Sequence, residues 1–201
     1  QKELLKKIMQ DFNSALYSPL VSTMETIFIV AFIFSCILVL YLYKNKSNYL
    51  ITALPLFVLA SHQLEEYVLS PLMFGDKYHF LEWAFRSGVN ISPIEVTTIN
   101  SVPYFLLPLL FLLKPSTKIF SILFLFNSSL LLSNGMFHIG LATAQTDYSP
   151  GMVTSLFMYI PLYIKSLYLA SERSLPMRGQ IAITIYGSIA HFLMIWLVNI
   201  F

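Results

Sequence analysis

Six long runs of apolar residues, separated by short polar stretches, dominate the 201-residue chain. About 20 mostly apolar residues in a helix are enough to cross the hydrocarbon core of a bilayer. The pattern therefore predicts an all-α polytopic membrane protein, a bundle of six transmembrane helices. The predicted spans cover about residues 24–43, 49–72, 95–113, 118–140, 150–171 and 180–201.

The first 20 residues follow a different pattern, in which apolar side chains recur at helical spacing and lysines lie elsewhere on the helical wheel. The apolar positions are Leu4, Leu5, Ile8, Phe12 and Leu16, and the lysines are Lys2, Lys6 and Lys7. This arrangement is typical of an amphipathic helix at the membrane interface. We therefore divide the chain into an N-terminal amphipathic helix over 1–20 and a transmembrane domain over 21–201.

The composition strengthens the membrane interpretation. Hydrophobic residues make up 57% of the chain and charged residues 11%, whereas a typical soluble domain has about 45–50% and about 25%. The expected partners are thus membrane lipids. The net charge of +2 and the lack of a basic cluster argue against nucleic-acid binding. Cys36 is the single cysteine, so the chain offers neither an internal disulfide nor a thiolate metal cluster.

Basic residues are distributed unevenly between the predicted loops. The first, third and fifth loops contain Lys44, Lys46, Lys114, Lys118, Arg173 and Arg178, whereas the second and fourth contain Lys77 and Arg86. Lys and Arg in short loops favour the cytoplasmic side. The predicted orientation therefore has the basic loops in the cytoplasm and both termini outside.

Nearly every polar residue inside the predicted spans lies in one half of the bilayer. Those that are candidates for a site are His62, Glu65 and Glu66 in the second span, Asn134 and His138 in the fourth, and His191 in the sixth. Because alternate spans run in opposite directions, all of these residues fall in the half of the bilayer away from the basic loops. Ionisable residues at membrane depth are costly and usually functional, so we predict a functional site in this outer half.

Three more polar residues lie toward the same side of the bilayer. Tyr148 precedes the fifth span, and Arg86 lies in the second loop. Both are candidates for the site. His79, also in the second loop, is expected to be an ordinary surface residue.

Three short motifs occur in order along the chain: HQLEE at 62–66, NGMFH at 134–138 and YSPG at 148–151. Together they resemble the signature of the HXXEE family of bacterial integral membrane proteins. The resemblance implies a location in the bacterial cytoplasmic membrane and singles out the residues of the three motifs. It supplies no reaction, because the family has no established activity.

The histidines and the carboxylates suit a zinc ion, which in catalytic sites keeps three protein ligands and one open position for water. In one arrangement His62, His138 and His191 are the ligands, and Glu66 is a fourth ligand or the general base. In another, His62 and Glu66 both bind the metal and Glu65 is the base. The sequence leaves both arrangements open.

Three further side chains have possible roles in such a site. Asn134 could orient a ligand or polarise a substrate carbonyl, and Tyr148 or Arg86 could stabilise a developing oxyanion. These roles predict a membrane-embedded, metal-dependent hydrolase or acyl-transfer enzyme that acts on a lipid or another hydrophobic substrate.

Two other functions stay open at this point. A di-iron carboxylate oxidoreductase uses two Glu-x-x-His motifs and two further glutamates. Here the order is His-x-x-Glu on one helix, and the further glutamates would have to be Glu25 or Glu95. A small transporter or binding protein would instead use the His/Glu cluster to carry a metal or a proton.

Overall fold

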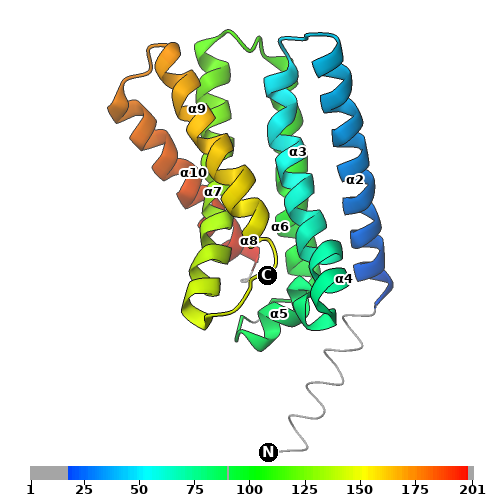
Figure 1. Cartoon of the computed structure of the whole chain (residues 1–201). Coiled ribbons are helices and arrows are strands. Elements are labelled where there is room, and N and C mark those ends of the chain that lie inside the picture. Colours follow the sequence, from blue (N-terminus) through cyan, green and yellow to red (C-terminus); the bar gives the residue numbers. More distant parts are fainter. Residues whose placement is uncertain (1–17, 90, 199–201) are drawn as a thin grey trace, which may run out of the picture.

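The computed structural model of the chain describes residues 18–89 and 91–198. Within these ranges the chain forms helices joined by short loops and contains no strand, which confirms the all-α prediction (Figure 1). The elements are α2 (Pro19–Lys44), α3 (Leu50–Leu64), η1 (Glu65–Leu69), α4 (Ser70–Phe74), η2 (Asp76–Tyr78), α5 (Phe80–Arg86), α6 (Pro93–Leu106), η3 (Leu107–Leu112), α7 (Lys118–Gln145), α8 (Met152–Thr154), η4 (Ser155–Tyr159), α9 (Ile160–Glu172) and α10 (Met177–Val198).

Five helices in this part of the chain are long and apolar enough to cross a membrane. They are Pro19–Lys44, Pro93–Leu112, Lys118–Gln145, Met152–Glu172 and Met177–Leu197. Each coincides with one of the six predicted spans. The remaining predicted span, 49–72, is helical from Leu50 to Phe74 but is not among the five. It is the span that carries His62 and the two glutamates.

The predicted amphipathic helix over 1–20 lies mostly outside the described residues. Of that segment the structure describes residues 18–20, where Ser18 caps the N-terminus of α2 and Pro19 is its first residue. Proline is favoured at this position because the N–H groups in the first turn of a helix have no partner within the helix, so the N–H that proline lacks is not missed there. The first membrane-length helix therefore begins a few residues earlier than the predicted span.

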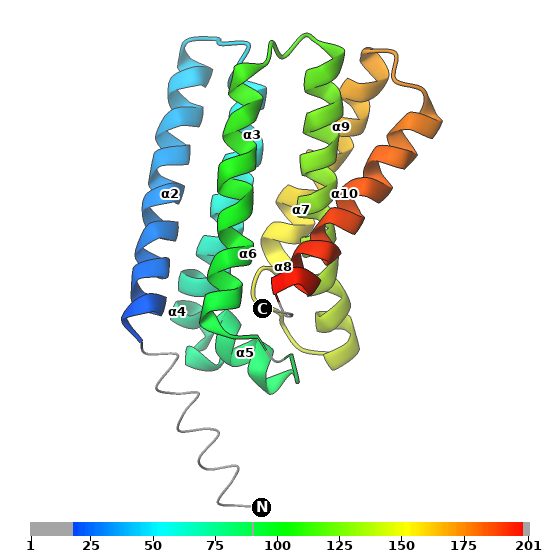
Figure 2. The ribbon, with the colours of Figure 1, turned by 180° about the vertical axis from the view of Figure 1, so that it is seen from behind.

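The long helices run side by side between two ends (Figures 1 and 2). α7 packs against α9 and α10 and also contacts α3, while α2 packs against α3. The loops after α2, η3 and α9 lie together at one end, which we call the basic end because it carries Lys44, Lys114 and Arg173. The loop from α7 to α8 lies at the opposite end, together with α5 (Figure 1).

Two helices contain one widened, π-helical turn each, and both turns have the same cause. The N–H of Ser70 bonds to the carbonyl of Glu65, and the N–H of Ile160 bonds to the carbonyl of Ser155, in each case five residues back. A proline follows each bond by one position, at residues 71 and 161. Proline cannot donate a backbone hydrogen bond, and its ring clashes with the carbonyl four residues before it, so the preceding turn widens.

One glycine brings two of the helices unusually close. A Cβ on Gly187 of α10 would lie 2.7 Å from the backbone oxygen of Phe126 in α7. Only a residue without a side chain fits at such a backbone contact, as is common where membrane helices cross. This contact fixes the height at which α10, including His191, meets α7.

Candidate metal centre

Three possible metal ligands converge toward the end of the bundle that is opposite to the basic end. They are His62 in α3, Glu66 in η1 and His138 in α7, and one ligand atom from each lies within 4.8 Å of the others. Glu66 Oε1 is 3.5 Å from His62 Nε2 and 3.0 Å from His138 Nε2. All three side chains are buried. The structure therefore brings together three of the residues that the sequence analysis assigned to one site.

The spacing of these atoms suits a small tetrahedral ion. Zinc binds nitrogen and oxygen ligands at about 2.0–2.2 Å, so two ligand atoms of one tetrahedron lie about 3.4 Å apart. The two measured separations, 3.0 and 3.5 Å, are close to this value. In addition, the buried His138 Nε2 has no aligned hydrogen-bond partner, although the Glu66 oxygen lies so near. The cluster therefore provides a ligand atom that no hydrogen bond occupies.

The outer nitrogen of each imidazole is held by a hydroxyl group. His62 Nδ1 is 2.8 Å from Thr154 Oγ1, and His138 Nδ1 is 3.2 Å from Ser149 Oγ. The Thr154 hydroxyl donates its only proton to Glu65 Oε2 at 2.6 Å, so His62 Nδ1 must carry the proton that joins it to Thr154. His62 Nε2 is then left with its lone pair facing Glu66, the form that binds metals.

Asn134 contacts the same lone pair. Its Nδ2 lies 3.0 Å from His62 Nε2 and donates to it. A lone pair serves one partner at a time, so Asn134 and a metal ion compete for His62. The prediction placed Asn134 close to the ligands, and the structure does so.

Glu65 has a different environment from its neighbour Glu66. Its carboxylate accepts four hydrogen bonds: one from the hydroxyl of Tyr148, one from the N–H of Val153, and two from Thr154, through its N–H and its hydroxyl. Val153 and Thr154 belong to the first turn of α8, whose N–H groups have no partners within the helix. Glu65 therefore caps this helix from another part of the chain and fixes the Thr154 hydroxyl that holds His62.

Tyr148 belongs to the support of Glu65. Its hydroxyl donates to Glu65 Oε1 at 2.6 Å and lies 2.8 Å from Ser70 Oγ. Burial and the hydrogen bond to Glu65 raise the pKa of Tyr148 well above its ordinary value. Because this proton is already engaged, the geometry favours a positioning role for Tyr148.

The YSPG motif forms the loop that covers the cluster, and its glycine is required for two reasons. Gly151 has a φ of +88°, in the left-handed region that side chains disfavour. A Cβ there would also lie 2.6 Å from His62 Cε1 and 3.1 Å from Glu66 Cγ. The backbone of the loop thus packs directly against His62 and Glu66 and leaves no room for a side chain at residue 151.

An apolar pocket of about 100 Å³ reaches Glu66 from the side of α6 and α10. Two amide side chains, Asn100 and Asn134, line it together with Glu66. The rest of its wall is mainly apolar and consists of Tyr67, Phe80, Val89, Ile91, Val96, Ile99, Phe137 and Ile195. The cluster therefore borders a space suited to a mainly hydrophobic ligand that has one polar end.

His191 lies outside the group of three ligands. It is 2% exposed, and neither ring nitrogen has a hydrogen-bond partner among the described residues. It borders a small cavity of about 20 Å³ together with Asn100 and Asn134. His191 was predicted as a ligand from its depth in the sixth span, but Gly187 positions α10 so that the imidazole faces this cavity beside the three possible ligands.

Arg86 is also separate from the cluster. Its side chain is exposed, and its Nη1 donates to the backbone oxygen of Lys77 at 3.2 Å. α5 ends at this residue, and its buried face carries Phe80, Leu81, Trp83 and Ala84. The structure therefore does not bring Arg86 to the place where an oxyanion would form.

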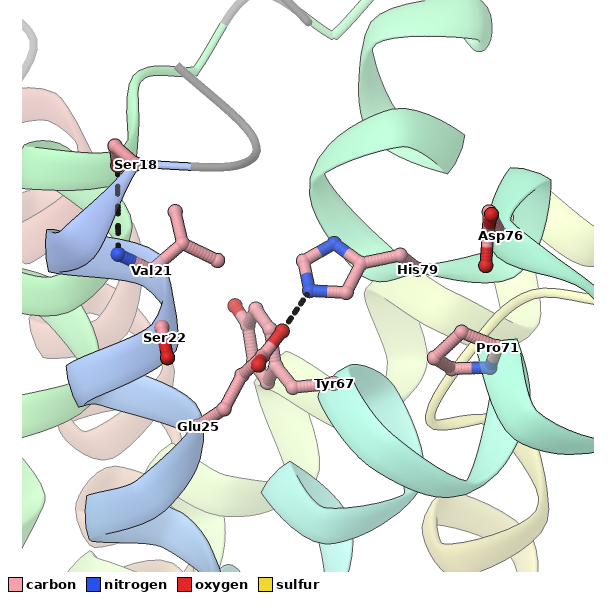
Figure 3. A pocket seen from close by; sticks show the side chains of 8 residues that line it. All are labelled: Ser18, Val21, Ser22, Glu25, Tyr67, Pro71, Asp76 and His79. Carbon is pink, nitrogen blue, oxygen red and sulfur yellow. Dashed lines mark hydrogen bonds and ion pairs between the residues drawn. The ribbon is translucent and has the colours of Figure 1, made fainter. Parts of the chain in front are cut away.

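His79 was expected at the surface, and that prediction is wrong. The side chain is 6% exposed, and its Nε2 lies 3.0 Å from Glu25 Oε1. Figure 3 shows the two side chains meeting across a pocket of about 340 Å³ that also reaches Tyr67 and Asp76. The loop containing His79 folds back onto α2, which sequence spacing does not reveal. Tyr67 borders both this pocket and the apolar one.

Sequence reasoning missed the residues that support the ligands. Ser149 and Thr154 flank Gly151 and hold the two imidazoles, and the ring of Tyr159 lies 4.6 Å from that of His62. Ser149 lies inside the YSPG motif and Thr154 three residues after it, which is their only signal in the sequence. Small hydroxyl residues are frequent throughout the apolar spans, so nothing indicated that these two would hold the imidazoles.

The fold and the site define an all-helical protein with several membrane-length helices and a buried histidine–glutamate cluster. The chain belongs to the family described as "Protein of unknown function with HXXEE motif", which matches residues 52–165. All three motifs lie within this match, whereas His191 lies outside it. No curated protein and no solved structure matches the chain.

Proposed function

We propose that the protein is a metal-dependent membrane hydrolase or acyl-transfer enzyme with zinc bound by His62, Glu66 and His138. The observation that carries the proposal is the convergence of the three buried ligand atoms within 4.8 Å, next to an apolar pocket. Two histidines and one carboxylate form a ligand set found in catalytic zinc sites, which keep a further position open. Zinc, when bound, supplies a Lewis acid and lowers the pKa of a water toward about 7.

The residues around the ligands have defined tasks in this proposal. Glu65 acts through Thr154, which orients His62, and is therefore a positioning residue. Asn134 releases His62 Nε2 when the metal binds, which frees its amide to donate to a substrate carbonyl at the border of the pocket. Donors aimed at a developing oxyanion are commonly worth about 2.7–4 kcal/mol of transition-state stabilisation.

The substrate proposed is a lipid or another hydrophobic molecule, because the pocket is mainly apolar apart from Glu66, its two amides and Tyr67. A carbonyl close to Glu66 and Asn134 would leave the hydrocarbon part of the substrate among Val96, Ile99 and Phe137. These residues belong to helices that are long enough to cross the membrane. A lipid would therefore reach the pocket without leaving the bilayer.

We further propose six transmembrane spans, with Leu50–Phe74 as the span that carries the site. Its low content of charge apart from the site, and its position beside α2 and α7, support this count. The basic end would face the cytoplasm of a bacterial cell, because Lys and Arg favour that side. The cluster would then lie in the outer half of the cytoplasmic membrane, with both termini outside.

A di-iron centre has less support from the geometry. It would need glutamates beyond Glu66, but Glu65 is held by four donors, and Glu25 meets His79. Glu95 forms a capping box with Ser92 at the start of α6. A transporter or binding protein for a metal or a proton stays the second candidate, since the buried His/Glu cluster would serve it equally well.

The test is elemental analysis of the purified protein in wild-type form and in three variants. We expect about one equivalent of zinc in the wild type, and its loss in His62→Ala and His138→Ala. His191→Ala is the matched control, because it removes a buried histidine of the same depth from outside the ligand group, and it should keep the metal. Folded wild-type protein without metal, or equal loss in the control, would contradict the proposed centre.

A second measurement separates the enzyme from the binding protein. Lipid extract incubated with the zinc-loaded protein should release fatty acid or an acyl-transfer product. Asn134→Ala should lower this rate by about 10²–10³-fold while leaving the zinc bound. If zinc is present but no lipid turns over, the metal-binding alternative is favoured.

A further inference from the structure

A separate cavity of about 460 Å³ lies at the basic end of the bundle, far from the histidine–glutamate cluster along the helices. It is bordered by the loop before α3, the loop between η3 and α7, and the last two turns of α9. Three cationic side chains line it: Lys114 from the second of these loops, and Lys165 and Arg173 from α9 or its end. Lys114 and Arg173 also belong to the basic loops on which the predicted orientation depends.

Lys165 is unusual in its position. It lies within the membrane-length helix Met152–Glu172, seven residues before the end, whereas the other basic residues of this end flank the spans. Its ammonium group lies 5.0 Å from the centre of the Tyr168 ring. A lysine inside an apolar span usually extends toward the interface, and this one extends to the cavity that also contains Lys114 and Arg173.

The three cations lack anionic partners in the part of the chain that the structure describes. None of them forms an ion pair there, and no carboxylate lines the cavity. The Nε of Arg173 is buried and has no hydrogen-bond partner among these residues. Like charges that share a cavity repel each other, and a buried unpaired N–H is costly. An anion in the cavity would remove both costs.

We propose that this cavity binds a phosphate group, supplied by the headgroup of an anionic phospholipid. The guanidinium of Arg173 offers paired donors that match phosphate oxygens, and the two lysines add charge. The cavity lies where the helices end, which is the depth of lipid headgroups. Ile51 and Leu169 also line it and offer apolar contact for the adjoining hydrocarbon. Basic pockets between transmembrane helices on the cytoplasmic side commonly hold such headgroups.

Inorganic phosphate is the other source of the same chemistry, and the experiment distinguishes the two. Purified full-length protein in a neutral detergent is titrated with phosphatidylglycerol, phosphatidylcholine or inorganic phosphate. Bound lipid is measured by native mass spectrometry, and the melting temperature is recorded for all three ligands. Neither readout depends on metal or activity, so this proposal stands or fails independently of the proposed function.

The test variant is Lys114→Gln/Lys165→Gln/Arg173→Gln. The matched control, Lys44→Gln/Lys46→Gln/Lys118→Gln, removes the same charge from the same end without altering the lining of the cavity. Each basic residue near a membrane surface contributes enough attraction for about a fivefold change in affinity. We expect the wild type and the control to bind phosphatidylglycerol at least tenfold more tightly than phosphatidylcholine, and the test variant to lose that preference.

The possible results separate clearly. Equal loss in the test and control variants would overturn the proposal, because the attraction would then come from general surface charge. No preference of the wild type for either phosphate source over phosphatidylcholine would also overturn it. Stabilisation by inorganic phosphate alone, absent in the test variant, would support the phosphate site and identify the free ion as its source.

Two single substitutions test the proposal in case the triple variant does not fold. Arg173→Lys keeps the charge but removes the paired donors, and Lys114→Gln alters an exposed loop side chain. Lys114→Gln should weaken phosphatidylglycerol binding by about fivefold, and Arg173→Lys should weaken it through the loss of the paired donors. Neither should lower the melting temperature of the lipid-free protein. Unchanged binding in both would contradict the proposal.

Discussion

Gly151 offers a direct test of the geometry of the cluster, because alanine there would meet the ligands themselves. The added Cβ would lie 2.6 Å from His62 Cε1, whereas ordinary contacts begin at 3.4 Å. The imidazole would therefore have to move by about 0.8 Å. It is held by Thr154 and by Asn134, and it is completely buried, so it has no open space to enter.

The size of this displacement decides the expected result. Metal sites tolerate changes in ligand distance of about 0.2 Å, several times less than the shift that Gly151→Ala imposes. Disturbing the surroundings of a ligand typically weakens metal binding by about 10–100-fold. For the zinc centre proposed above, we therefore expect Gly151→Ala to bind zinc at least tenfold more weakly than the wild type, as measured by competition with a chromogenic chelator.

Backbone strain has to be separated from the contact with His62. Gly151 and Gly88 both have positive φ, +88° and +78°, but a Cβ on Gly88 would meet nothing within 4 Å. Both alanine variants incur strain of about 1–3 kcal/mol. Gly88→Ala is therefore the control, and we expect Gly151→Ala to melt at a clearly lower temperature. Equal melting temperatures together with unchanged zinc affinity would refute the geometry described here.

Three further predictions address other parts of the structure. Glu65→Gln replaces one acceptor oxygen by a donor that faces N–H and O–H groups, so it should lower stability by about 3 kcal/mol or more, measured by thermal melting; an unchanged melting temperature would contradict its role as the cap of α8. Gly187→Ala places a Cβ 2.7 Å from a backbone oxygen and should destabilise the protein, whereas Gly140→Ala, with nothing within 4 Å, should stabilise it by up to about 1 kcal/mol. The Tyr78 hydroxyl lowers the pKa of Asp147 from its ordinary 3.8. A carboxyl group whose pKa is lowered in the folded protein stabilises the fold at pH values above its ordinary pKa, and this stabilisation is lost as the pH falls through the pKa of the folded state. The difference in melting temperature between wild type and Tyr78→Phe should therefore be largest above pH 3.8 and shrink below it.

The two π-helical turns have a local cause in the sequence, but their effect on the site depends on tertiary packing. Pro71 and Pro161 alone are sufficient reason for a widened turn in each helix. Their consequence for the site is set by packing, because Glu65 and Glu66 lie in one widened turn and Ser155 and Tyr159 in the other. The ring of Tyr159 then lies against His62.

The two adjacent glutamates show where sequence reasoning reached its limit. Both are acidic, both lie in the same predicted span, and either could have been the ligand or the base. Tertiary structure separated them: Glu66 faces the two imidazoles, while Glu65 faces the first turn of α8 and the hydroxyl of Tyr148. Residues next to each other on a helix point about 100° apart, so what each one meets depends on which helices pack there.

The sequence by itself determined the all-helical class, five of the membrane-length helices, the family, and the common depth of His62, Glu66, Asn134 and His138. These features depend on hydropathy, on short motifs, and on the fixed rise of a helix, all of which are local properties. Only the tertiary structure decided that Glu65 supports the site, that His191 and Arg86 lie outside the ligand group, and that His79 is buried against Glu25. Those outcomes depend on the rotation and height of each helix against its neighbours, which are set by close contacts such as those at Gly151 and Gly187.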